Sequence, residues 1–169
     1  MGLMMIAEKA KNRAKSILRA LLEDNKSKFP EFPRRIQLET TSLCPCRCIM
    51  CPGYNAPRKN KFMEDSLIEQ IIDECAPEGT VMQLLFYGDP LLDKRIVDIV
   101  RKCKVKELPT VITTVGRQLT PQLSQELLDE GLGHCGFSVD GNTKETYEKI
   151  RVGSDFEKVI QNIETFIEL

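Results

Sequence analysis

The feature that most constrains this chain is a repeating order of short apolar runs and longer amphipathic stretches, which begins at residue 34 and occurs four times. The apolar runs predict strands over residues 36–39, 80–86, 110–113 and 136–139. The amphipathic stretches have helical spacing and predict helices over residues 63–75, 93–104, 120–131, 143–150 and 156–167. Strand–helix repeats of this kind form parallel sheets with right-handed crossovers. The sequence therefore predicts an α/β fold with about four parallel strand–helix units.

A polar cluster follows each of the predicted strands. A cysteine-rich loop follows the first strand, and the segments 87–90, 114–116 and 138–141 follow the other three. Ligands of parallel α/β folds bind beyond the carboxyl ends of the strands, which share one edge of the sheet. We therefore expect the four clusters to form one site.

Four of the seven cysteines lie between residues 44 and 51. Cys44, Cys48 and Cys51 follow the spacing Cys-x3-Cys-x2-Cys, and Cys46 is an additional thiol inside the loop. In a reducing compartment, clustered thiols more often hold a metal or do redox chemistry than form disulfides. Sulfur ligands suit an iron–sulfur cluster or zinc, and three thiolates leave one iron of a cubane cluster open to another ligand.

Two alternatives to an iron–sulfur site exist at this stage. Structural zinc usually takes two separated pairs of ligands, whereas this sequence has no second cysteine pair and a single histidine, His134. The other alternative is a set of thiols that bind no metal. The spacing of three cysteines on one loop disfavours this alternative. The spacing favours an iron–sulfur cluster over both.

Charge and hydropathy exclude several classes of protein. The chain has 24 Lys and Arg against 25 Asp and Glu, and this net charge of −1 gives no electrostatic case for nucleic acid as the main partner. There is no run of 18 apolar residues, so the sequence predicts no transmembrane segment. The N-terminus lacks the order of a secretory signal, and we therefore expect a cytoplasmic location.

Residues 3–28 predict an amphipathic helix with one apolar face and one basic face. Such a helix can lie on an anionic membrane or contact nucleic acid, but a solvated face on a helix packed against the main domain is the commoner case. Pro30 and Pro33 end this helix. We accordingly expect a helical extension and linker over residues 1–33 and one domain over residues 34–169.

Four motifs occur in order along the expected domain. The first is Cys44-x3-Cys48-x2-Cys51, which is preceded by Glu39 and followed by Pro52. The others are the segments 86–92, 114–116 and 137–162. Together they resemble the motifs of the radical S-adenosylmethionine (radical SAM) enzymes, in the branch of peptide-modifying (SPASM-type) and molybdopterin-pathway enzymes. This resemblance covers residues 34–169 and implies a partial TIM-like barrel.

The resemblance implies a role for each matched residue. Cys44, Cys48 and Cys51 would ligate three irons of a [4Fe–4S] cluster, and S-adenosylmethionine (SAM) would bind the fourth. The residues implied to contact SAM are Met50, Gly88, Asp89, Pro90, Ser138, Asp140 and Arg151. The residues that would act on a substrate are unknown.

Arg151 is implied to pair with the carboxylate of SAM, because the charges match and a guanidinium presents a fork of donors. The alternative from the sequence is a surface ion pair with Glu148 or Asp155, since exposed pairs of this kind are common.

The sequence also departs from the family motifs. Tyr87 replaces a glycine, and Asp89 replaces a glutamate that is one methylene longer. Val115 replaces an asparagine and removes a polar contact.

The family's barrels usually have more strand–helix units than this chain. A sheet of four parallel strands cannot close, so the fourth strand would present an edge. We expect that edge to be covered by a second copy, by another protein or by the N-terminal helix. The chain is either complete or part of a longer polypeptide, and the sequence leaves both alternatives open.

We therefore expect a radical SAM enzyme that takes an electron from a donor and abstracts hydrogen from an unknown substrate, either a peptide or a small metabolite. The competing hypothesis is a non-catalytic or incomplete iron–sulfur (or metal) binding protein that acts with a partner. An electron-carrying module is disfavoured, because a three-cysteine site leaves one iron reactive.

Overall fold

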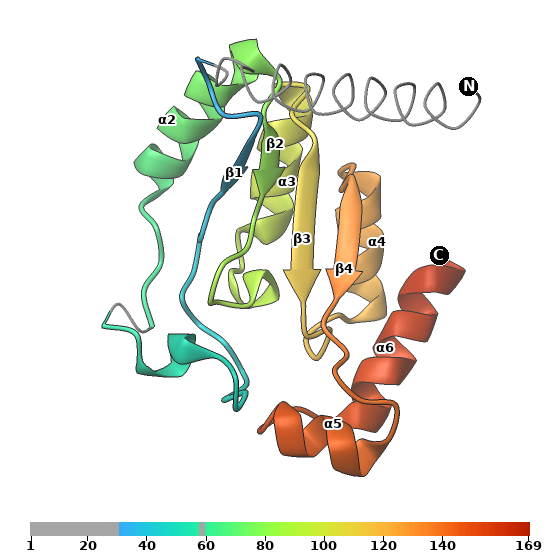
Figure 1. The fold of residues 1–169 in the computed structure, drawn as a ribbon. Coiled ribbons are helices and arrows are strands. Elements are labelled where there is room, and N and C mark those ends of the chain that lie inside the picture. Colours follow the sequence, from blue (N-terminus) through green and yellow to red (C-terminus); the bar gives the residue numbers. More distant parts are fainter. Residues whose placement is uncertain (1–30, 58–59) are drawn as a thin grey trace, which may run out of the picture. The chain divides into compact units, whose positions relative to one another are not determined.

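A parallel sheet of four strands organises the chain, and the computed structural model describes residues 31–57 and 60–169 (Figure 1). The strands are β1 (Arg35–Gln37), β2 (Val81–Gln83), β3 (Thr110–Thr114) and β4 (His134–Phe137), in that spatial order. Every neighbouring pair is parallel, which confirms the expected α/β fold with four strands. The expected helix over residues 3–28 lies outside the described residues.

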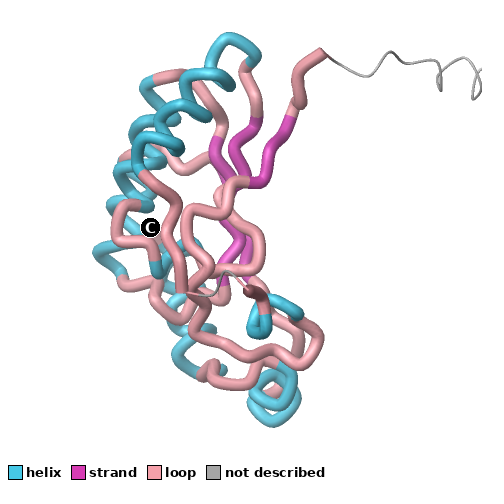
Figure 2. Tube along the Cα trace, turned by 90° about the vertical axis from the view of Figure 1, so that its left-hand side faces the viewer, coloured by secondary structure: helices cyan, strands magenta, loops and turns pink. Residues whose placement is uncertain are grey.

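Helices connect the strands and follow the last one. They are α2 (Asp65–Cys75), α3 (Ile96–Val105), α4 (Pro121–Asp129), α5 (Lys144–Ile150) and α6 (Phe156–Glu168). Three short 3-10 helices, η1 (Pro52–Asn55), η2 (Ala76–Glu78) and η3 (Pro90–Leu92), lie in the loops. Seen from the side, most helices lie on one side of the strands (Figure 2).

Local capping explains where several helices begin. The Thr120 side chain accepts a hydrogen bond from the Leu123 N–H at 3.1 Å, and Pro121 occupies the first turn, where its missing N–H costs nothing. Thr143 and Asp155 cap α5 and α6 in the same way. These starts agree with the sequence prediction, because caps act over only three or four residues.

All four strands differ in extent from the prediction. The first ends at Gln37 rather than at residue 39, and the third extends by one residue to Thr114. The second ends at Gln83 rather than near Phe86, because the Leu85 N–H turns back to the Gln83 carbonyl at 2.9 Å and the chain leaves the ladder. The fourth strand begins at His134, opposite Val111, rather than at residue 136. Strand ends depend on the neighbouring strand's register, which no local pattern encodes.

The main core lies between the sheet and the helices. Its fully buried apolar side chains come from both layers: Ile68, Met82, Leu84, Ile96, Val100, Ile112, Leu119 and Leu127. A second cluster joins the cysteine loop to the helices after β4, and it contains Cys46, Cys48, Val115, Tyr147 and Val159. The cysteine loop is therefore packed into the domain and does not extend freely from it.

Both outer strands have one paired side only. Among the described residues, β1 pairs with β2 alone and β4 pairs with β3 alone, so the sheet is not closed. In the same part of the chain, no helix is both long enough and apolar enough to cross a bilayer.

Candidate functional site

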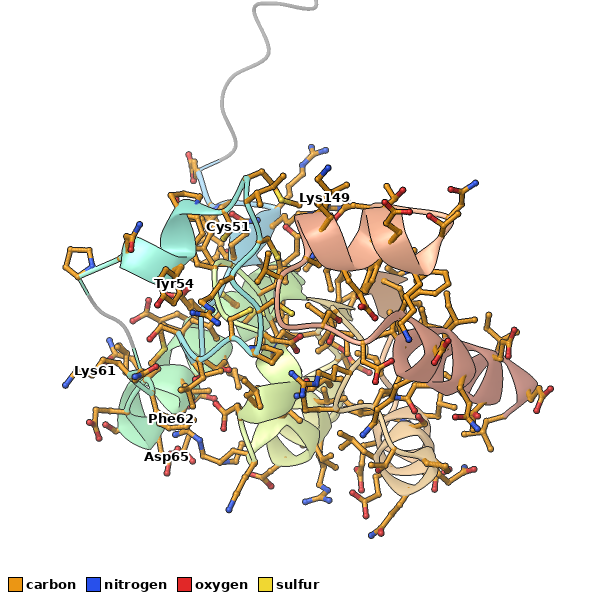
Figure 3. All side chains as sticks on the ribbon, turned by 90° about the horizontal axis from the view of Figure 1, so that it is seen from below. Cys51, Tyr54, Lys61, Phe62, Asp65 and Lys149 are labelled. Carbon is orange, nitrogen blue, oxygen red and sulfur yellow. The ribbon has the colours of Figure 1, made fainter. Side chains whose placement is uncertain are left out.

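The carboxyl ends of all four strands contribute to one cavity of about 200 Å³. Seen from this end, Cys51 lies between Tyr54 of η1 and Lys149 of α5 (Figure 3). The cavity is lined by Cys44, Cys48, Met50, Cys51, Leu85, Phe86, Tyr87, Gly88, Asp89, Thr113, Thr114, Val115, Ser138 and Arg151. The expectation that the four polar clusters form one site is thus met by the tertiary structure.

Most residues proposed from the sequence line this cavity. They are the three cysteines of the motif together with Met50, Gly88, Asp89, Ser138 and Arg151. Pro90 and Asp140 are not among its described lining residues. Pro90 is buried at the start of η3, and Asp140 pairs with Arg151 beside the cavity.

A second, smaller cavity of about 40 Å³ adjoins the same cysteines. Cys44, Cys48 and Cys51 line both cavities, whereas Cys46 lines only the smaller one. The motif cysteines therefore lie between the two cavities. The smaller cavity is lined by all four cysteines of the loop, and the larger one by the strand ends.

Each motif sulfur accepts a hydrogen bond from a different donor. The Cys46 thiol donates to Cys44 and is the main reason why the pKa of Cys44 falls to about 7. The Arg151 guanidinium Nη1 lies 3.6 Å from Cys48 Sγ, and the Gly53 N–H lies 3.4 Å from Cys51 Sγ. Donors of this kind stabilise thiolate, which is the form that binds a metal.

Burial acts to raise the pKa of three of these thiols, although for Cys44 the hydrogen bond from Cys46 outweighs it. At Cys48 burial raises the pKa, although the nearby Arg151 partly offsets the effect. The pKa of Cys46 is also raised, first because its thiol proton is held by Cys44 and then because the group is buried. Their mutual hydrogen bond thus lowers the pKa of Cys44 and raises that of Cys46.

The cysteine loop is closed at its base and supported along its length. Thr41 and Phe62 form an isolated antiparallel bridge, and the Ser42 N–H donates to the Lys61 carbonyl at 2.9 Å. Further along, the N–H groups of Arg47 and Ile49 donate to carbonyls of residues 150–152 at 2.8 and 3.0 Å. The turn after α5 therefore holds the loop in place.

Arg151 occupies the centre of this support. Its Nε lies 2.5 Å from Asp140 Oδ2, and the side chain is only 13% exposed. The alternative of an ion pair with Glu148 or Asp155 is wrong: the Glu148 carboxylate accepts the Phe156 N–H, and Asp155 caps α6. The arginine instead links the end of β4 to the cysteine loop.

Asp89 is almost fully enclosed, with 3% of its surface exposed. Its carboxylate accepts hydrogen bonds from Thr114 Oγ1 at 2.8 Å, from the Val115 N–H at 3.0 Å and from the Leu91 N–H at 3.1 Å. Burial outweighs these donors and raises the pKa of Asp89. The side chain ties the segment after β2 to the end of β3, so any contact with a ligand is left to its backbone.

Glu39 and Thr114 belong to the site, although the motif comparison gave them no individual role. One oxygen of Glu39, Oε1, accepts the N–H groups of Tyr87 and Gly88 at 2.9 and 3.2 Å. The Thr114 hydroxyl donates to Asp89. Their positions in the sequence could have identified them, because both lie at the carboxyl end of a strand.

The donor set differs from that of a single-ion site. Among residues 31–57 and 60–169, no three Cys, His, Asp or Glu side chains gather closely enough to ligate one metal ion. A cubane cluster does not require such convergence, because each thiolate binds a different iron. The three motif thiols each have their own hydrogen-bond donor and line the smaller cavity. This arrangement fits a cubane cluster.

A larger groove of about 340 Å³ lies elsewhere, between α2 and α3. Its charged side chains pair across it, Lys102 with Glu69 and Lys106 with Asp73, both at 2.8 Å. No residue of the four motifs lines it. The strand ends, and not this groove, bring the chemistry-bearing residues together.

Comparison with protein families gives a match to the radical SAM superfamily over residues 38–169. Among curated proteins, a probable GTP 3′,8-cyclase of Methanocaldococcus jannaschii is 27% identical over 146 residues, which are 85% of this chain and 49% of the relative. An AdoMet-dependent heme synthase of Methanosarcina barkeri is 29% identical over 136 residues, 78% of this chain and 38% of the relative. The chain thus spans about half the length, or less, of these relatives.

Solved structures share the fold at lower identity. Streptococcus suis SuiB bound to precursor peptide SuiA matches with a TM-score of 0.70 and 18% identity, over 93% of this chain and 35% of that one. Native anSMEcpe with bound AdoMet and Cp18Cys peptide matches with a TM-score of 0.65 and 21% identity, over 81% and 40%. These matches confirm the partial-barrel architecture.

Proposed function

The chain belongs to the radical SAM superfamily, whose enzymes use a [4Fe–4S] cluster and SAM, and on that premise we propose that it binds both and cleaves SAM reductively. One observation carries the proposal: the three motif cysteines line a cavity that is completed by the ends of the other three strands. The cysteines that would ligate a cluster thus border the space in which SAM would bind.

The chain's own residues hold and orient the two groups. Cys44, Cys48 and Cys51 would ligate the cluster, and the donors to their sulfurs favour the thiolate form. Arg151 places positive charge beside Cys48 and within the cavity, where a carboxylate of SAM would meet it. Met50 offers an apolar wall for the adenine ring.

When bound, the cluster and SAM supply reductive cleavage of the sulfonium bond, which yields methionine and a 5′-deoxyadenosyl radical that abstracts hydrogen. The protein's contribution is position and exclusion of water. Gly88 and Asp89 would present backbone groups to the methionyl amine, Pro90 would fix the end of that segment from its buried position, and Ser138 would add a polar contact. Asp140 would act through its ion pair with Arg151.

The substrate is a peptide or a small metabolite. Both classes occur in the names of similar proteins, which include GTP 3′,8-cyclases and a structure with a bound precursor peptide. An electron donor is required by the chemistry, and we place the protein in the cytoplasm, where thiols stay reduced. We expect residues 34–169 to act as the radical SAM domain and residues 1–33 as its extension.

The open side of β4 needs a cover. A second copy of the chain, another protein or the N-terminal segment would provide one. Light scattering together with amide exchange of residues 134–137 tests this expectation: a monomer whose β4 amides exchange without protection would contradict it.

A second candidate function is a cluster-binding protein that lacks catalysis by itself. It is favoured by Val115, which lines the cavity with an apolar side chain. The two candidate functions differ in one measurable property, because only the first includes cleavage of SAM.

The deciding experiment measures iron content and 5′-deoxyadenosine after anaerobic reconstitution, with SAM and dithionite added. Wild type should bind about four irons and form product, and Cys48→Ala should not form product. Cys75→Ala is the matched control, because Cys75 is a buried thiol at the end of α2 that lines neither cavity. Iron without product would favour the second function, and absence of iron would overturn both.

A further inference from the structure

We propose that Glu39 is a positioning residue, which turns the segment 86–89 so that it offers carbonyl oxygens to a ligand ammonium group. The inference rests on the proposed function, because the ammonium group in question is that of the methionyl part of SAM. Glu39 would touch neither the cluster nor SAM and would act through the backbone of Tyr87 and Gly88.

The first step concerns the N–H groups of the segment. Those of Tyr87 and Gly88 donate to the same Glu39 oxygen at 2.9 and 3.2 Å. The N–H of Asp89 donates to the Leu43 carbonyl at 2.7 Å. Pro90 has no N–H group. Each backbone donor from residue 87 to residue 89 is therefore already used inside the protein.

The second step follows from peptide geometry. In a planar trans peptide the N–H and the preceding carbonyl point in opposite directions, and the described residues include no cis peptide bond. The carbonyls of Phe86, Tyr87 and Gly88 therefore point away from Glu39 and Leu43. Because the same residues line the 200 Å³ cavity, the backbone polar groups that residues 87–89 leave for a ligand are carbonyl acceptors.

The third step is that the arrangement is held rigidly. A side-chain carbon on Gly88 would lie 1.9 Å from the Thr41 carbonyl oxygen, so the segment packs directly against the start of the cysteine loop. Glu39 itself is placed by its neighbour Leu38, which is buried and donates its N–H to the Gln83 carbonyl at 2.8 Å. The carboxylate is thus fixed from β1 and acts on the segment that follows β2.

An acceptor-only surface selects a cation, and an ammonium group carries three donors. The carboxylate adds negative charge behind that surface. Without the Glu39 acceptor, the exposed Tyr87 N–H and the half-buried Gly88 N–H lose a shared partner, and their peptides can rotate toward water or another acceptor. Such a rotation would place donors where the ammonium group binds.

The test measures SAM binding to anaerobically reconstituted protein by calorimetry. Glu39→Leu removes the acceptor, whereas Glu39→Gln retains an oxygen that can accept both N–H groups. Glu164→Gln, an exposed glutamate of α6, is the matched control. 5′-Methylthioadenosine, which lacks the methionyl amine and carboxylate, serves as the comparison ligand.

We expect Glu39→Leu to lose about tenfold or more in SAM affinity while its iron content, its melting temperature and its affinity for methylthioadenosine stay near wild type. Glu39→Gln should recover most of the SAM affinity. Amide exchange of Tyr87 and Gly88 in cluster-free protein should accelerate in Glu39→Leu only.

Three results would overturn the assignment: unchanged SAM affinity in Glu39→Leu, an equal loss for both ligands, or a loss of iron in the same variant. The last two would indicate general damage to the cavity or to the cysteine loop. If wild type holds its cluster but binds no SAM, the proposed function fails first and the role of Glu39 fails with it.

Discussion

Substitution of Gly88 by alanine should separate the segment after β2 from the cysteine loop. The new carbon would lie 1.9 Å from the Thr41 carbonyl oxygen and 2.8 Å from its carbonyl carbon. Ordinary contact begins at 3.4 Å, so the two backbones must move apart by about 3.4 − 1.9 = 1.5 Å. Both obstacles are backbone atoms, which cannot rotate away as a side chain would.

The cost can be worked out from the hydrogen bonds that span this contact. A movement of that size breaks the 2.7 Å bond from the Asp89 N–H to Leu43 and disturbs the two bonds to Glu39. One neutral bond contributes about 1 kcal/mol and a bond to a charged group about 1.5–3 kcal/mol. Loss of one neutral bond and weakening of both charged bonds gives about 4 kcal/mol, or a melting temperature lower by roughly 10 °C.

Urea unfolding of cluster-free protein measures this change, with Gly79→Ala as the control. Gly79 has φ +62 but nothing within 4 Å of an added carbon, so alanine there meets backbone strain alone, about 1 kcal/mol. Gly88→Ala should therefore cost several times more than Gly79→Ala. Equal effects, or a Gly88→Ala loss below about 1 kcal/mol, would refute the argument from close packing.

Three further predictions concern single side chains. Cys46→Ala should keep the full iron content, because Cys46 packs in the buried cluster and does not line the larger cavity; an iron assay after reconstitution that showed a loss would identify it as a ligand. Arg151→Lys should retain iron but weaken SAM binding by about tenfold, since lysine lacks the fork of donors; calorimetry measures this, and unchanged affinity would exclude the carboxylate role. Burial raises the pKa of Asp89 in the folded protein above its ordinary value of 3.8, so its stabilising contribution is complete below that value and is lost as the pH rises through the raised pKa. Urea titrations of wild type and Asp89→Asn across this range should show wild type losing stability relative to the variant as the pH rises, and a constant difference would contradict the shift.

Much of the site could be anticipated because its signals are local in the sequence. The spacing of Cys44, Cys48 and Cys51 places three thiols on one loop whatever the rest of the chain does. The alternation of strand and helix patterns then requires the four polar clusters to share one edge of a parallel sheet. Helix starts such as Thr120-Pro121 were equally readable, since a cap satisfies N–H groups only a few residues away.

The sequence did not predict which side chains at this edge of the sheet pair with each other. Glu39 meets Gly88 across 49 positions, and Arg151 meets Cys48 across 103. Sequence proximity suggested Glu148 or Asp155 for the arginine, but the fold brings Asp140 closer.

The sequence by itself determined the cysteine loop and the alternation of strands and helices in this protein, because periodicity, capping and cysteine spacing act between near neighbours. Only the tertiary structure decided which carboxylate holds which donor and how far each strand extends. Those outcomes depend on distances between segments that the chain brings together only when the sheet forms, so the roles of Glu39, Asp89 and Arg151 emerge from the fold.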